Sequence, residues 1–99
     1  MQEEKRKKAD EVVQHAFGER VRRLRLARGW SQEDFAAHSG LHRTWVGVIE
    51  RGERGVTLLT LLMIAKSFKI TVSELLSGLE KSVAKMRPPK KAAHIARTD

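Results

Sequence analysis

Cysteine is absent from the 99 residues of this sequence. Its absence excludes disulfide bonds, catalysis by a thiol and the usual cysteine-based zinc clusters. The fold must therefore be held together by its apolar side chains alone, and the composition suits a reducing compartment.

Long apolar runs are missing as well. No stretch approaches the roughly 18 apolar residues that a membrane-spanning helix needs. The charged beginning of the chain, MQEEKRKKAD, lacks the apolar segment of a secretory signal peptide. We expect a cytoplasmic protein and, at this length, a single domain.

Acidic residues are too few to balance the basic ones, which leaves a net charge of +8. The excess is uneven, because residues 1–15 are neutral while residues 16–80 carry +3 and residues 81–99 carry +5. A basic domain with a more basic tail favours a polyanionic partner such as nucleic acid. Solvated basic tails also occur on proteins without such a partner, so charge alone is a weak argument.

Helical spacing of apolar residues dominates the middle of the chain. Ser31 with Asp34, and Thr71 with Glu74, have the spacing of capping boxes at helix starts. Gly29, Gly40 and Gly52 stand where helices would end. The expected helices are FGERVRRLRLARG (17–29), SQEDFAAHSG (31–40), RTWVGVIERG (43–52), VTLLTLLMIAKSF (56–68) and TVSELLSGLEKSVAKM (71–86).

Strand patterns and internal repeats are absent, so the sequence predicts a compact all-α domain of five helices over residues 16–80. Residues 1–15 mix charges without a clear apolar stripe and are expected to be a frayed or flexible N-terminal segment or the loose start of a helix. Residues 81–99 are expected to hold the end of the fifth helix and a basic, disordered tail.

Two short helices separated only by SGL must cross steeply, which is the geometry of a helix-turn-helix over residues 31–51. The residues agree: RVRRLRLARGWSQEDFAAHSGLHRTWVGVIERGERGVTLLTLLMIAKSFKITVSELL closely resembles the lambda-repressor-like, Xre-type helix-turn-helix family. Within it, GLHRTWVGVIERGER is most similar to the restriction-modification controller proteins. The resemblance implies a five-helix lambda-repressor-like fold and binding to double-stranded DNA.

In that family the third helix enters the major groove and the second crosses the phosphate backbone. The resemblance therefore implies DNA contacts by two sets of residues. Near the start of the second and third helices these are Gln32, Arg43, Thr44 and Trp45. At and after the end of the third helix they are Arg51 and Arg54, which we expect to bind phosphate.

Arg43 is the best candidate for reading a base, because its guanidinium can donate to guanine O6 and N7 together. Two neighbours allow more than one interpretation. Trp45 could contact DNA or pack in the core. Gly47, which costs about 1 kcal/mol inside a helix, could allow close approach of DNA or of the second helix.

The family also uses an ion pair between the first and third helices at the positions of Arg25 and Glu50. We expect an exposed pair, worth roughly 0 to 1 kcal/mol, that orients the third helix. Two independent surface charges are the alternative.

The fourth helix carries more apolar residues than the family pattern needs. Leu58, Leu61, Ile64, Ala65 and Phe68 match the usual core positions, yet the positions between them are also apolar. Such a second face favours a partner, here a second copy of the chain. The alternative is burial under the fifth helix. The expected dimer interface comprises Leu59, Leu62, Met63, Leu79 and Val83.

The sequence thus predicts a transcriptional regulator that binds a near-palindromic operator as a homodimer. A helix-turn-helix antitoxin that binds a toxin, and a scaffold without DNA affinity, remain alternatives. An enzyme is disfavoured, because no catalytic constellation or phosphate-binding loop is present. Asp34, His38 and His42 make a poor metal site because the helix breaks between the histidines, and no cofactor is expected.

Overall fold

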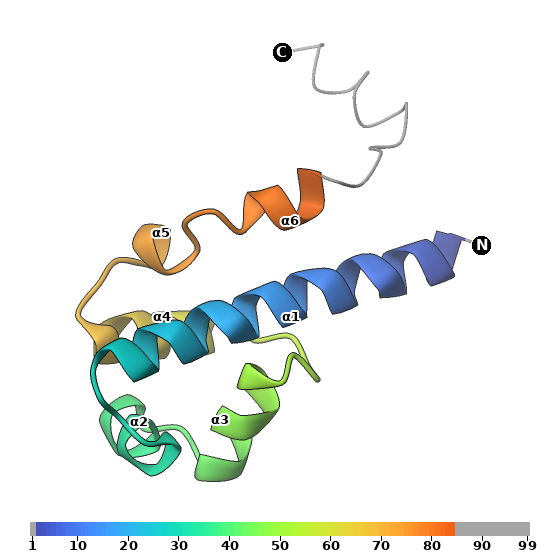
Figure 1. Cartoon of the computed structure of the whole chain (residues 1–99). Helices are drawn as coiled ribbons and strands as arrows, with labels where there is room; N and C mark the ends of the chain where they lie inside the picture. Colours follow the sequence, from blue (N-terminus) through green and yellow to red (C-terminus); the bar gives the residue numbers. More distant parts are fainter. Residues whose placement is uncertain (1, 85–99) are drawn as a thin grey trace.

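The computed structural model describes residues 2–84, and every regular element in that range is an α-helix. The all-α fold class is therefore confirmed. The helices, labelled in Figure 1, are α1 (Gln2–Ala27), α2 (Gln32–Ser39), α3 (Arg43–Glu50), α4 (Leu58–Phe68), α5 (Val72–Leu75) and α6 (Glu80–Ala84). None of these helices is both long enough and apolar enough to cross a membrane.

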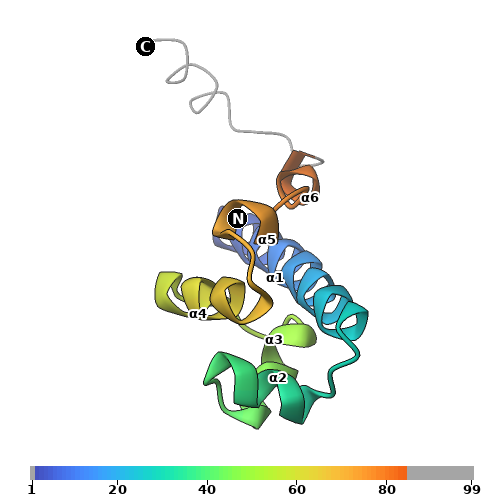
Figure 2. The same cartoon turned by 90° about the vertical axis from the view of Figure 1, so that its left-hand side faces the viewer.

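Helix α1 is the central element of the arrangement. Figures 1 and 2 show α2 and α3 on one side of it and α5 and α6 on the other. Helix α1 contacts both α3 and α6, while α4 contacts α2 and α5. Helix α3 is therefore supported by α1, whereas α2 is supported by α3 and α4.

The core lies where these helices meet. It combines Phe17 and Val21 of α1 with the aromatic rings of Phe35 and Phe68, whose centroids are 4.9 Å apart. Val46 and Ile49 of α3 are buried in the same cluster. Leu58 does not join them: it is 70% exposed, so its assignment to the core was wrong. As the first residue of α4, it lies a full turn or more outside the positions that face inward.

Helix α1 begins at Gln2, far earlier than the pattern of residues 1–15 suggested. Glu3 and Glu4 in its first turn interact favourably with the helix dipole. Val13 supplies part of the support, because it lines an apolar groove together with Leu79 and Val83. The apolar face of this half of α1 has few residues, and the residues that it packs against, Leu79 and Val83, lie at the other end of the described chain. Residues 2–15 are therefore helical and not frayed.

The single fifth helix expected over residues 71–86 is instead two short helices. Thr71 caps α5 through the expected capping box with Glu74. Gly78 then takes the left-handed conformation, with φ of 84°, and separates α5 from α6. The basic tail and Met86 lie beyond the described residues.

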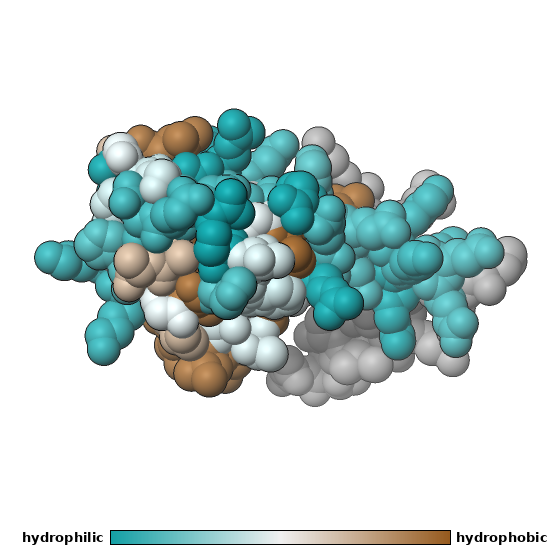
Figure 3. Space-filling view, turned by 90° about the horizontal axis from the view of Figure 1, so that it is seen from below, coloured by the Kyte–Doolittle hydropathy of each residue, from teal (hydrophilic) through white to brown (hydrophobic). Residues whose placement is uncertain are grey.

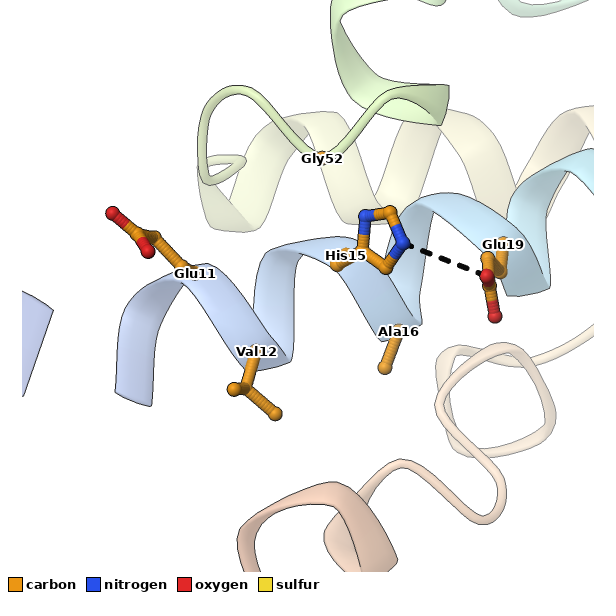
Figure 4. Close-up of a pocket in the computed structure, with 6 residues that line it drawn as sticks. All are labelled: Glu11, Val12, His15, Ala16, Glu19 and Gly52. Atoms are coloured by element: carbon orange, nitrogen blue, oxygen red, sulfur yellow. Dashed lines mark ion pairs between the residues drawn. The ribbon is translucent and has the colours of Figure 1, made fainter. Parts of the chain in front are cut away.

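Two glycines let the backbones of α1 and of the end of α3 approach closely. A Cβ on Gly18 would lie 2.4 Å from the carbonyl oxygen of Ile49, which no side chain can do without displacing a backbone. Gly52 has a φ of 69°, and a Cβ there would lie 2.6 Å from Cα of His15. Figure 4 shows Gly52 beside His15. The C-terminal end of α3 is thus fixed against α1 by backbone proximity.

Candidate nucleic-acid interface

The turn between α2 and α3 is built by local capping. Ser31 and Asp34 form the expected capping box at the start of α2, with Asp34 N donating to Ser31 Oγ over 3.0 Å. The hydrogen bond from the backbone N–H of Ser31 holds the pKa of the Asp34 carboxyl below its usual range. Gly40 ends α2 with a φ of 77°, and His42 caps α3 by accepting from Thr44 N through Nδ1. These caps fix where α3 begins.

Helix α3 is sharply divided between a buried and an exposed face. Val46 and Ile49 are almost completely buried in the core. Arg43 and Thr44 at its N-terminal end are exposed. Trp45 is half-buried and packs against the core cluster, so its contact with DNA remains a prediction. Figure 3 views the molecule from the side on which α2 and α3 lie, where the surface is largely hydrophilic.

The ion pair between α1 and α3 is present and it is buried. Arg25 Nε donates to Glu50 Oε2 over 2.6 Å, and Nη2 donates to Oε1 over 2.9 Å. Arg25 and Glu50 are only 7% and 8% exposed, so the expectation of an exposed pair was wrong. The hydrogen bond to Glu50 raises the pKa of Arg25 further above its ordinary value. Arg25 also donates to the carbonyl of Trp30 over 2.8 Å, which ties the pair to the segment just before α2.

Gln32 extends this pair into a network of three helices. Its Nε2 donates to Glu50 Oε1 over 3.2 Å. The side-chain amide of Gln32 therefore has a structural partner in the free protein. Its contact with DNA remains a prediction. For this contact, the amide would have to bind Glu50 and a phosphate together, or leave Glu50 to bind the phosphate.

Arg43 is held by a residue that the sequence analysis did not name. Its Nε donates to Glu33 Oε1 over 2.8 Å, and the two side chains are 50% and 68% exposed. The hydrogen bond from Arg43 holds the pKa of the Glu33 carboxyl below its usual range. Arg43 is thus oriented by an acid on α2 and is still open to solvent.

Arg51 is held in a similar way by Glu53. Its Nε and Nη2 donate to the two carboxylate oxygens of Glu53 over 3.0 and 3.2 Å. The guanidinium of Arg51 also covers Gly47, because a Cβ there would lie 2.9 Å from Arg51 Nη1. The side chain nearest to Gly47 is therefore that of Arg51, the residue that caps the C-terminal end of α3, and the flank of α2 is not the closest surface. Approach of DNA to Gly47 would require Arg51 to move.

Arg54 is exposed in the loop after α3 and lines the groove of about 440 Å³ to which α1 and α6 also contribute. Asp10 and Glu80 line the same groove. The contact of Arg54 with phosphate remains a prediction.

The expected dimer residues fall into two separate groups. Leu59 and Leu62 are 66% and 51% exposed on α4, while Met63 is half-buried with its Cε near Gly40 at the helix-turn-helix bend. Leu79 and Val83 instead line the groove between α1 and α6. The residues expected to form one apolar face therefore lie in two places: exposed leucines on α4, and side chains that line the groove between α1 and α6.

Another hollow lies over α1 beside Gly52 and has a volume of about 460 Å³. Figure 4 shows Glu11, His15 and Glu19 along it, with His15 Nε2 at 3.6 Å from Glu19 Oε1. The two other histidines of residues 2–84 have structural contacts, since His38 stacks on Trp30 at 4.1 Å and His42 caps α3. Across the same residues, no three metal-binding side chains are grouped as a metal site requires.

The sequence did not single out Glu33, Glu53 or Gly18. The contacts of these residues appear only once the chain is folded. Glu33 is ten residues from Arg43 along the chain and on another helix. Its only sequence signal was an acid in the first turn of α2, which a helix dipole explains equally well.

A short helix, a glycine turn and a second short helix with a polar, exposed start, packed on a supporting helix, define a helix-turn-helix domain. Comparison with known proteins agrees: residues 21–75 match the HTH_3 helix-turn-helix family. The chain belongs to this family, which confirms the resemblance seen in its sequence.

Its relatives include restriction-modification controllers. The control protein C.SmaI of Serratia marcescens is 45% identical over 65 residues, which are 66% of this chain and 77% of that protein. The crystal structure of the controller protein C.AhdI from Aeromonas hydrophila is similar with a TM-score of 0.59 and 47% identity, over 65% of this chain and 94% of that one. A tetramer of the controller C.Esp1396I bound to its natural 35 base-pair operator matches with a TM-score of 0.64 and 29% identity, over 73% and 95% of the two chains.

Proposed function

We propose that the protein is a transcriptional regulator that binds double-stranded operator DNA through the N-terminal end of α3. The observation that carries the proposal is the contrast within this helix: Val46 and Ile49 are buried, whereas Arg43 and Thr44 are exposed at its start. Membership of the helix-turn-helix family and likeness to controller proteins support the same function. These relatives give the antitoxin alternative no support.

In this proposal Arg43 reads a guanine through O6 and N7, and Thr44 contacts a thymine methyl group or a phosphate. Gln32, Arg51 and Arg54 contact phosphates, and Trp45 packs beside the sugar-phosphate backbone. Phosphate contacts fix the register of the protein on the duplex, while the base contact supplies specificity.

A homodimer is the proposed binding unit. Leu58, Leu59 and Leu62 present apolar side chains to solvent along α4, a surface that one small domain does not bury. The operator-bound tetramer of C.Esp1396I supports assembly on DNA. A two-fold dimer of this kind places its recognition helices about 34 Å apart, so half-sites one DNA turn apart are expected.

The DNA-binding proposal is tested by selecting duplexes from a randomised pool with purified protein and by footprinting the selected sequence. We expect enrichment of a near-palindromic site protected on one face of the duplex. Binding to all sequences with equal affinity would contradict the proposal. Loss of binding with rising salt is expected in either case, because phosphate contacts release counterions, and therefore does not discriminate.

The dimer is tested by replacing Leu59 and Leu62 together with Glu. Light scattering should then give the mass of a monomer, and affinity for the full operator should fall much more than affinity for a half-site. Leu26→Glu is the matched control, because Leu26 is 53% exposed on α1 and lies outside the proposed interface. A folded double variant that keeps the dimer mass would rule out this surface.

A further inference from the structure

The contact between Glu33 and Arg43 uses only part of the arginine. Nε donates to Glu33 Oε1 over 2.8 Å, and this is the one hydrogen bond of the Arg43 side chain within residues 2–84. The terminal nitrogens Nη1 and Nη2 form one pair of parallel donors from which guanine O6 and N7 can accept. Glu33 therefore occupies the Nε side of the guanidinium and leaves this end-on pair of donors open.

The exposure of the contact argues against a role in stability. Both side chains are half or more exposed, and exposed ion pairs contribute little to folding because water competes for them. An arginine with a long flexible side chain loses conformational freedom when it binds a base. A partner that already orients the guanidinium reduces that loss, which is the general advantage of preorganisation.

The same carboxylate discourages the wrong partner. If Arg43 turned toward a phosphate on random DNA, Glu33 would lose its hydrogen bond and remain as an anion close to the phosphate backbone. Repulsion between like charges would then weaken the complex. A guanine at the right position avoids this conflict, because Arg43 can keep Glu33 and bind the base at the same time.

We propose that Glu33 is a positioning residue that sets the sequence specificity of the protein: it aligns Arg43 for a guanine and penalises its use on phosphates. The inference rests on the proposed DNA-binding function. It gives the acid on α2 a role in recognition although it touches no base.

The experiment compares two duplexes of equal length, one selected by the wild-type protein from a randomised pool and one with that sequence scrambled. The measured quantity is the ratio of the two dissociation constants at fixed salt. We expect Glu33→Gln to lower the preference for the selected duplex by about threefold or more, mainly through tighter binding to the scrambled one. Glu33→Asp keeps the charge but shortens the side chain, and should also lower the preference because Arg43 loses its alignment.

Glu53→Gln is the matched control. It removes the same charge from a second exposed arginine pair, yet Arg51 is proposed to contact phosphate, so both duplexes should bind more tightly and their ratio should stay constant. Thermal unfolding of each variant checks that the fold is intact.

A second measurement isolates the base contact. The guanine read by Arg43 is identified as the one whose replacement by 7-deazaguanine weakens binding of the wild-type protein but not of Arg43→Ala. This replacement removes the N7 acceptor. The penalty should be large for the wild-type protein and smaller for Glu33→Gln. An unchanged ratio and an unchanged penalty in Glu33→Gln would overturn the inference. A wild-type protein without any preference would instead refute the proposed function itself.

Discussion

The two ends of α3 are held in opposite ways. At the C-terminal end, Glu50 is 8% exposed and forms two hydrogen bonds with Arg25, and Gly18 lets the α1 backbone approach directly. At the N-terminal end, Arg43 is half-exposed, and Glu33, itself 68% exposed, is the one side chain among residues 2–84 that holds it by a hydrogen bond. The C-terminal end of α3 is thus packed tightly against α1, and the N-terminal end is open to solvent.

This difference assigns stability and recognition to separate parts of one short helix. A buried ion pair is a poor source of net stability, because removing both charges from water is costly. Its geometry is nevertheless specific, since two parallel hydrogen bonds allow one orientation of α3 relative to α1. The exposed end can then change its partners without loosening the helix.

The largest expected effect comes from breaking the buried end. Glu50→Ala leaves Arg25 buried without its carboxylate partner, and we expect a loss of about 3 to 5 kcal/mol in the free energy of unfolding. Urea denaturation followed by circular dichroism measures it. Glu53→Ala is the control, because it breaks an exposed arginine pair and should cost far less. Equal losses in the two variants would show that burial does not distinguish the two ends.

A smaller but still substantial loss is expected for Gly18→Ala. In an open helix this change would stabilise by about 1 kcal/mol. Here the added Cβ meets the carbonyl oxygens of Ile49 and Glu50, so we expect a destabilisation of about 1 to 3 kcal/mol. Gly55→Ala is the control, since its nearest neighbour is the flexible side chain of Gln14. A stabilised Gly18→Ala variant would contradict the close approach of α1 and α3.

At the open end, Arg43→Ala should weaken binding to the selected operator by about 1 to 3 kcal/mol and leave binding to random DNA mostly intact. The melting temperature should barely change, because the side chain is half-exposed. Lys66→Ala, on the exposed side of α4, controls for the loss of one positive charge. Equal losses on operator and random DNA would remove Arg43 from base reading.

The smallest effect concerns pH. The hydrogen bond from Arg43 lowers the pKa of Glu33 in the folded protein. The associated stability is therefore present above the ordinary pKa of a glutamate and disappears as the pH falls through the lowered value. Carboxyl titration by NMR should show the pKa of Glu33 rising toward its usual range in Arg43→Ala, while that of Asp34, which depends on Ser31, stays low. An unchanged Glu33 titration would separate it from Arg43 in solution.

Local signals explain what the sequence could predict. Capping at Ser31 and Thr71, and the end of α2 at Gly40, depend on residues within a few positions of each other, and all are present.

Features that depend on distant parts of the chain were missed. The pairing of residues 2–15 with α6 requires two weakly apolar segments to meet, and neither is distinctive alone. The depth of the Arg25–Glu50 pair likewise depends on tertiary packing. The break at Gly78 differs, because a glycine in the left-handed conformation is a local signal that the sequence already contained. Glu33 escaped notice because nothing local distinguishes it from any acid at the start of a helix.

The groove shared by α1 and α6 has a consequence for the way the molecule opens. The first half of α1 and the last described helix cover each other through Val13, Leu79 and Val83, while the family match spans only residues 21–75 between them. Neither segment has enough apolar contacts to stay folded without the other. The two should therefore exchange their amide hydrogens with solvent as one cooperative unit. The helix-turn-helix would keep its slow exchange while this unit opens and closes. We therefore expect a local unfolding transition that leaves the packing of α2 and α3 intact.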